Sequence, residues 1–132
     1  MYLVDTSVWI ATFRARDPVD LEAIVPLDAV VTCLPLIQEV LQGFRDETAF
    51  RLAQDAMYAL PLVESPLTHL VIDDAVQLYR TARRQGITIR SSTDCLVAAC
   101  ALRHDLTVLH DDRDYTALAG ISRLKQQKLG SE

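Results

Sequence analysis

The sequence predicts a three-layer α/β/α fold with a mostly parallel central sheet of four to five strands. Short apolar segments alternate along the chain with longer segments whose apolar residues recur at helical spacing. Such alternation is typical of βαβ units, whose strands run parallel. The 132 residues fit one domain. We place this domain at residues 1–124 and expect the polar tail over 125–132 to fray.

Four short segments have strand character. Residues 2–4 are apolar and lead into Asp5, and residues 29–33 are rich in valine. Residues 60–63 and 106–109 are the other two candidates. Because all four runs are short and largely apolar, we expect them to form strands of one sheet.

The segments between these strands have helical starts, stops and spacing. In the longest one, Leu70 and Val71 follow Leu67 by three and four residues, which is helical spacing, and Gly86 ends the segment. The N-capping cluster Ser91–Asp94 precedes the most apolar helix. We expect helices over residues 6–13, 19–26, 35–43, 46–59, 67–85, 95–104 and 115–119.

Composition indicates a folded, soluble protein. Half of the residues are apolar and 23% are charged, and no apolar run approaches the roughly 18 residues that cross a bilayer. The N-terminus lacks the basic segment and cleavage site of a signal peptide. We therefore expect a cytoplasmic protein without membrane contact. Cys33, Cys95 and Cys100 show no C-x-x-C spacing, so we expect buried free thiols.

Four acids stand at positions where an α/β sheet gathers its ligands. Asp5 directly follows the first strand, and Asp112 lies in the acidic turn His110–Asp114 after the last one. The carboxyl ends of parallel strands meet at one edge of a sheet, where ligands bind. We expect the helix that begins at Asp94 to open onto this edge as well. Glu39 lies at the edge of the apolar stripe of its own helix.

Each acid also has a simpler explanation when it is taken alone. Asp5 and Asp94 are good helix caps, although neighbouring hydroxyl residues could cap as well. Glu39 could be a solvated residue on the flank of its helix. The turn around Asp112 could be an exposed acidic loop. Only the four acids in combination point to a site.

Four carboxylates in one pocket repel one another unless a cation compensates them. Hard oxygen ligands without histidine or thiol favour Mg²⁺ or Mn²⁺ over zinc. The net charge of −5 is the wrong sign for binding nucleic acid by bulk electrostatics, but an anionic pocket can bind a polyanion through such a cation. The expected chemistry is therefore hydrolysis of phosphodiester bonds, leaving 5′-phosphate and 3′-hydroxyl ends.

Two motifs resemble those of a known family. The opening Met-Tyr-Leu-Val-Asp-Thr-Ser-Val-Trp (residues 1–9) is similar to the start of PIN-domain proteins. Residues 92–102, followed by residues 106–115, resemble the C-terminal signature of VapC-type toxins. The resemblance covers nearly the whole chain. It implies a PIN-like fold and an endoribonuclease that is the toxin of a toxin–antitoxin pair, forms a homodimer and is blocked by a small antitoxin.

The resemblance also implies roles for individual residues. The family's four metal-binding acids fall on Asp5, Glu39, Asp94 and Asp112. For the fourth acid, Asp111 and Asp114 remain alternatives, and Asp114 is otherwise a supporting residue. Thr6 and Ser7 resemble the hydroxyl residues beside the first acid that help to hold it.

Arginines near the expected site are candidate contacts for RNA phosphates. Arg14 follows the first helix and Arg45 follows the helix of Glu39. Arg83, Arg84 and Arg90 lie around the end of the longest helix. Each of them could equally be a solvated surface residue.

Other α/β proteins that carry acids at strand ends fit the sequence less well. A phosphatase with an aspartyl nucleophile requires a second Asp two residues after the first, and position 7 is Ser. A response-regulator receiver requires a late lysine, and the only lysines, Lys125 and Lys128, lie in the tail. The remaining alternative is a non-catalytic PIN-like module that binds RNA or regulates, although such a module would gain nothing from four mutually repelling acids.

Overall fold

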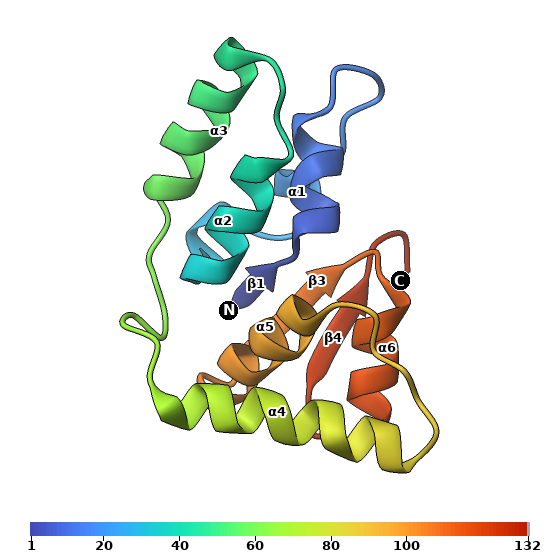
Figure 1. Cartoon of the computed structure of the whole chain (residues 1–132). Helices are drawn as coiled ribbons and strands as arrows, with labels where there is room; N and C mark the ends of the chain where they lie inside the picture. The colour runs from blue at the N-terminus through green and yellow to red at the C-terminus, as the bar shows by residue number, and fades with distance from the viewer. Residues whose placement is uncertain (132) are drawn as a thin grey trace.

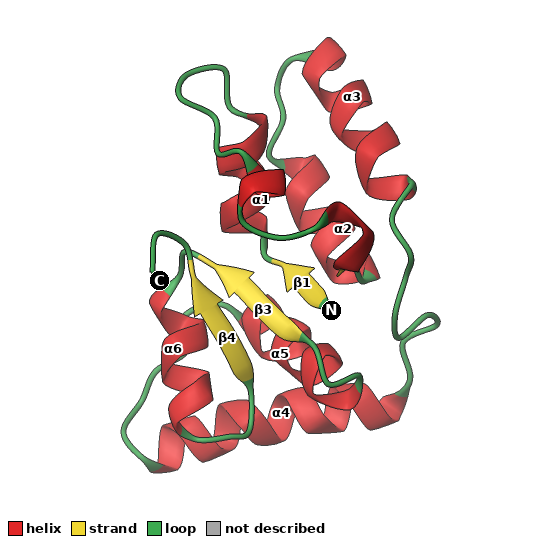
Figure 2. Cartoon of the chain, turned by 180° about the vertical axis from the view of Figure 1, so that it is seen from behind, coloured by secondary structure: helices red, strands yellow, loops and turns green. Residues whose placement is uncertain are grey.

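The computed structural model describes residues 1–131 and contains a four-stranded sheet in the order β2-β1-β3-β4. The strands are β1 (Tyr2–Val4), β2 (Val30–Val31), β3 (Thr107–His110) and β4 (Lys125–Lys128). Every neighbouring pair in the sheet is parallel. The arrowheads of β1, β3 and β4 accordingly lie toward the same edge of the sheet (Figure 2). The predicted α/β class with a parallel sheet is confirmed.

Helices cover both faces of this sheet (Figure 1). They are α1 (Thr6–Phe13), α2 (Leu34–Gln42), α3 (Glu47–Tyr58), α4 (His69–Arg84), α5 (Ser92–Arg103) and α6 (Arg113–Gly120). The first three lie on one side, and the last three lie on the other (Figure 1). Within residues 1–131 no helix combines the length and apolar character that crossing a membrane requires.

The two apolar cores follow from the alternation of side chains along each strand. Leu3 and Val108 belong to the core beneath α4, α5 and α6, whereas Val4 and Leu109 belong to the core beneath α1 and α2. All four are fully buried. The three cysteines are free and buried, as expected. Trp9 is buried in the second core, where its ring stacks on that of Phe13 at 5.7 Å between centroids.

Three local expectations were wrong. Residues 60–63 form no strand and contribute only an isolated bridge between Thr32 and Leu62. Residues 19–26 hold a single 3₁₀ turn, Leu21–Ala23, instead of an α-helix, and another 3₁₀ turn, Leu27–Ala29, follows them. Pro61 lacks the N–H that a paired strand donates, and Pro26 cannot continue a helix from the residues before it. The third error concerns the polar tail.

Residues 125–128 of this tail do not fray but form the edge strand β4. Its Lys-Gln-Gln-Lys sequence lacks the apolar alternation that predicts a strand. It is held instead by backbone pairing to β3 and by Leu124, which is buried in the core immediately before it. An edge strand that carries lysines is also poorly suited to pairing with another sheet.

Candidate metal centre

The carboxyl ends of β1 and β3 bring the first acids together. The two strands are neighbours, with Val4 opposite Leu109. The backbone N–H of Asp5 donates to the Leu109 carbonyl at 2.8 Å, so Asp5 lies beside the end of β3. The acidic turn follows directly after His110. Parallel pairing thus places segments that are about a hundred residues apart in the sequence at one edge of the sheet.

The predicted acids form one connected cluster. Asp5, Glu39 and Asp94 each offer a carboxylate oxygen, and these atoms lie within 4.8 Å of one another. Asp94, Asp112 and Asp114 form a second group by the same measure. Asp94 belongs to both groups and is therefore the centre of the cluster. Glu39 is supplied by α2 and Asp94 by α5, on opposite faces of the sheet.

The structure distinguishes the three candidates for the fourth acid by their positions. Asp112 is half-buried and Asp114 is buried, and both lie in the cluster. Asp111 is exposed, and it belongs to neither carboxylate group. Asp112 is also the N-cap of α6, where its carboxylate accepts from the Asp114 backbone N–H at 2.9 Å.

Asp5 and Asp94 differ in their relation to the helices that follow. Asp5 is the N-cap of α1 and accepts from the Ser7 backbone N–H at 3.1 Å, so the capping alternative holds for it alongside its place in the cluster. Asp94 is not a cap, because Ser91 occupies the N-cap of α5 and Asp94 lies in the first turn. Its carboxylate is therefore not required by the helix end.

The predicted hydroxyl residues contact the acids. Ser7 Oγ donates to Asp5 Oδ2 at 2.6 Å and accepts from the Asp111 backbone N–H at 3.0 Å. Thr6 Oγ1 donates to Glu39 Oε1 at 2.5 Å. These bonds fix the orientation of two carboxylates that reach the cluster from different elements.

Tyr115 is a site residue that the sequence interpretation missed. Its buried hydroxyl lies 2.8 Å from Asp5 Oδ1 and 3.2 Å from Asp94 Oδ1, so it bridges the two acids. Burial and the two carboxylates raise its pKa well above the ordinary value. Tyr115 and Leu118 are spaced as the core face of α6, whose first turn lies at the site. This spacing was the signal that could have identified the residue.

The second oxygen of Asp94 has no partner. Asp94 is 3% exposed, and its Oδ2 is buried without a hydrogen bond among residues 1–131. Burial, followed by the charges of Asp5 and Asp112, raises its pKa to about 8, although the hydrogen bond from the Tyr115 hydroxyl opposes this shift. A buried polar atom without a partner is rare and costly. Here the unpartnered atom is an oxygen surrounded by other carboxylates.

Arg90 is the one predicted arginine that contacts the cluster. Its guanidinium lies 4.0 Å from Asp112 and 3.9 Å from Asp114, with 59% of its side chain exposed. Long contacts made by an exposed side chain compensate little charge. Arg14 is exposed and donates to the Asp17 carbonyl, and Arg45 is exposed with no described contact to the acids. The cluster therefore keeps an excess of negative charge.

His110 supports the acidic turn and connects it to β4. This residue is fully buried, and its Nδ1 accepts from the Asp112 backbone N–H at 3.1 Å. Its Nε2 lies 2.6 Å from Gln126 Oε1, which can only accept. The two contacts together assign the neutral tautomer with the proton on Nε2. Gln126, in the segment that was expected to fray, thus helps to orient His110 beside the acidic turn.

The donor set fits a hard divalent cation. The clustered ligand atoms are all carboxylate oxygens, which suit Mg²⁺ or Mn²⁺ and not a thiophilic metal. Such an ion would give Asp94 Oδ2 a partner and would offset the excess negative charge of the cluster. Each of the two groups, Asp5 with Glu39 and Asp94, and Asp94 with Asp112 and Asp114, can therefore hold a divalent cation.

Comparisons with known proteins agree with this geometry. The model of the PIN domain family matches residues 2–121. VapC ribonuclease Mb1587 of Mycobacterium bovis is 34% identical to the chain over 136 residues, which cover 95% of this chain and 96% of that protein. Ribonuclease VapC51 of Mycobacterium tuberculosis is 32% identical over 124 residues, covering 92% and 87%.

Solved structures share the fold. VapBC-5 from Mycobacterium tuberculosis, a member of the VapBC family of toxin–antitoxin systems, superposes with a TM-score of 0.73 at 22% identity over 96% of this chain and 97% of that one. VapBC2 from Rickettsia felis, bound to a DNA fragment from its promoter, also gives 0.73, at 13% identity over 96% and 97%. The family model and the relatives above 30% identity show that the chain belongs to the PIN domain family and, within it, to the VapC ribonucleases.

Proposed function

We propose that this protein is a Mg²⁺- or Mn²⁺-dependent endoribonuclease that acts as the toxin of a toxin–antitoxin pair. The relatives above are named as ribonucleases, and related folds occur in toxin–antitoxin complexes. The observation that carries the metal dependence is the buried, unpartnered Oδ2 of Asp94 within a group of carboxylates.

In this proposal the acids together hold the cation. Asp5 and Asp94 hold the ion, with Glu39 and Asp112 completing the site and Asp114 in support. Ser7 and Thr6 keep Asp5 and Glu39 in position through their hydroxyl groups. When bound, a divalent cation lowers the pKa of water and offsets the negative charge of a phosphodiester.

The partners follow from the same proposal. RNA is the substrate, and a small cognate antitoxin blocks the acidic centre. A homodimer in the cytoplasm is the proposed working form. Support comes from the resemblance of the sequence motifs to VapC-type toxins and from the VapBC complexes among the solved structures.

The test is cleavage of mixed RNA by the purified protein with Mn²⁺ or with EDTA. Asp5→Asn removes one ligand, and Asp55→Asn, an exposed acid on α3, is the matched control. We expect cleavage only with metal, 5′-phosphate ends, and a loss of at least about 100-fold in Asp5→Asn, since even outer-shell changes cost metal sites about 10- to 100-fold. Circular dichroism checks that each variant is folded.

Three results would contradict the proposal. These are cleavage that persists in EDTA, equal activity of Asp5→Asn and Asp55→Asn, and product ends that carry a 2′,3′-cyclic phosphate. The alternative, a non-catalytic module that binds RNA or regulates, would show RNA binding with no cleavage under any metal condition.

A further inference from the structure

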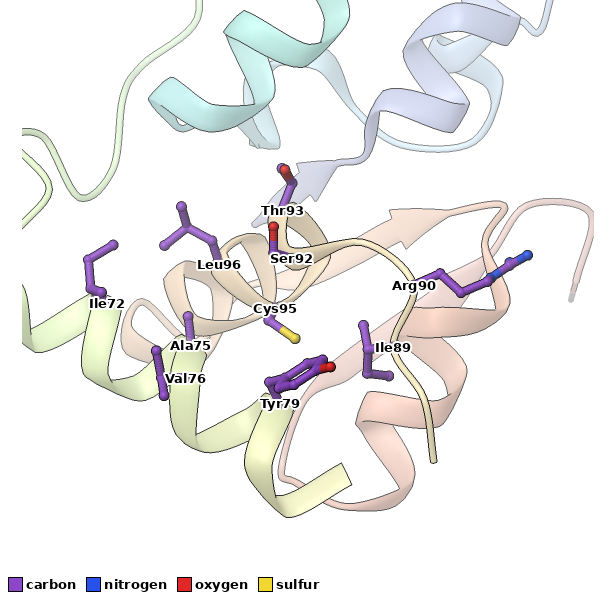
Figure 3. Close-up of a pocket in the computed structure, with 10 residues that line it drawn as sticks. All are labelled: Ile72, Ala75, Val76, Tyr79, Ile89, Arg90, Ser92, Thr93, Cys95 and Leu96. Carbon is purple, nitrogen blue, oxygen red and sulfur yellow. The ribbon is translucent and has the colours of Figure 1, made fainter. Parts of the chain in front are cut away.

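A groove lies between α4 and α5 (Figure 3). Its volume is about 560 Å³. Its apolar lining includes Tyr79, Ile89 and Cys95, and its polar lining consists mainly of Arg90, Ser92 and Thr93. Figure 3 shows the Tyr79 ring beneath Cys95 and next to Ile89. We call this surface the α4–α5 groove.

The α4–α5 groove lies next to the candidate metal centre. Thr93, which lines the groove, immediately precedes Asp94. The backbone N–H of Arg90 donates to Asp114 Oδ2 at 3.1 Å, and its guanidinium lies 4.0 Å from Asp112. Arg90 and Thr93 therefore place the rim of the groove beside the acids.

The other end of the groove is strongly basic. A second hollow of about 330 Å³ shares Tyr79 with the groove and is lined by Arg80, Arg83 and Arg84. With Arg90, residues 79–90 hold four of the thirteen basic residues of the chain and no acid. In the described part of the chain, no ion pair within 4.0 Å involves Arg80, Arg83 or Arg84. These cations are available to an external anion.

Tyr79 supplies a flat, partly exposed ring among these cations. The residue is 37% exposed. The Arg83 guanidinium lies 6.0 Å from the ring centroid, and its Nη1 donates to the Tyr79 hydroxyl at 3.3 Å. An aromatic ring beside a row of arginines is the combination with which proteins bind single-stranded nucleic acid, since bases stack on the ring and phosphates contact the cations.

The charge of this surface argues against other occupants. An apolar peptide would leave the arginines without partners. A symmetric dimer built on this surface would bring the arginines of both copies into one interface, where like charges repel. A polyanion with flat apolar groups satisfies both parts of the surface.

We propose that the α4–α5 groove binds single-stranded RNA next to the scissile phosphate, with a base stacked on Tyr79 and backbone phosphates on Arg80, Arg83 and Arg84. The substrate class rests on the proposed function. The groove gives a protein of net charge −5 a local basic path to its acidic centre. Binding through this path does not require the metal.

The test measures the affinity for a short unstructured RNA in EDTA, by fluorescence anisotropy, at several salt concentrations. We expect Tyr79→Ala to weaken binding by about 5- to 150-fold, the range for losing one stacked base, and Tyr79→Phe to retain it. The double change Arg83→Ala and Arg84→Ala should weaken binding and reduce the salt slope by about 1.4, for two lost contacts to a single strand. Tyr58→Ala, an exposed tyrosine on α3, is the control and should bind normally.

Because EDTA prevents metal-dependent cleavage, the outcome does not depend on catalysis. Unchanged affinity in Tyr79→Ala, or an unchanged salt slope in the double variant, would overturn the proposal. It would also be overturned if Tyr79→Ala changed the oligomeric state in solution and not the RNA affinity, because the groove would then be a subunit interface. If the variants change RNA affinity as expected but the protein cleaves no RNA in Mn²⁺, the result would contradict the proposed function and still support RNA binding in the groove.

Discussion

Acids lie at both ends of α5, in opposite electrostatic settings. At the N-terminal end, Asp94 is buried among other carboxylates, and its pKa is raised to about 8. At the C-terminal end, Arg103 Nε lies 2.7 Å from Glu64 Oε1, His104 Nε2 lies 3.0 Å from the same oxygen, and a further contact reaches Asp74. The Arg103 guanidinium lowers the pKa of Glu64, and His104 adds to this effect.

This difference separates a structural group of acids from a ligand-binding group. Glu64 is matched by cations of its own chain, so nothing further is needed at that end. Within residues 1–131, no cation pairs with Asp94, and one of its oxygens has no partner. A cluster of mutually repelling acids therefore indicates a ligand-binding site only where the fold places no cation beside it.

The rate of RNA cleavage should depend on Asp94, at the N-terminal end of α5, and not on Glu64, at the C-terminal end. Asp94→Asn is expected to lower the RNA cleavage rate by at least about 100-fold, because it removes a ligand at the centre of the cluster. Glu64→Gln should leave the rate unchanged. Cleavage of a labelled RNA in Mn²⁺ measures both variants. Equal losses would mean that the two ends do not differ in function.

Tyr115 sharpens the comparison because it bridges two acids without being one. Tyr115→Phe removes only the hydroxyl, so Asp5 and Asp94 lose a common partner. We expect the affinity for Mn²⁺ to fall by about 10-fold, as for other groups that orient metal ligands. Calorimetric titration with Mn²⁺ measures this change, with Tyr58→Phe as the control. An unchanged affinity would show that the bridge does not orient the ligands.

The stability of the metal-free protein should depend on pH through Asp94. Its pKa is about 8 in the fold, against an ordinary value of 3.8, so the folded state binds a proton that the unfolded chain releases between these values. The free energy of unfolding should therefore fall as the pH rises from about 4 to 8. Asp94→Asn should flatten this dependence and raise Tm above the natural protein near pH 8. Thermal melts in EDTA test this, and a dependence that survives the substitution would contradict it.

At the opposite end of α5, the contribution of Glu64 to stability should have the reverse pH dependence. The lowered pKa of Glu64 means that its contribution to stability is present at neutral pH and is lost as the pH falls through the acidic range. Glu64→Gln should lower Tm slightly at pH 7, because the pair is partly solvated, and hardly at all in acid. Thermal melts at both pH values measure this, and a larger destabilisation in acid than at pH 7 would contradict it.

Sequence patterns predicted the parallel sheet and the meeting of Asp5 with the acidic turn, because strand ends in an α/β fold share one edge. They could not place Glu39, which depends on how α2 packs against α1. They missed Tyr115, whose spacing with Leu118 indicates a core position but does not show which acids its hydroxyl contacts. They also missed β4, whose polar sequence is held by pairing to β3 and not by its own pattern. In each case the missing information was tertiary packing.

The most direct test of the central claim is a titration of the metal-free protein with Mn²⁺ near pH 8, followed by the electron paramagnetic resonance of the free ion. We expect saturable binding by the natural protein and by Glu64→Gln, and a loss of that binding in Asp94→Asn. Absence of saturable binding up to the millimolar range, or equal binding by Asp94→Asn, would contradict a metal centre built on these acids.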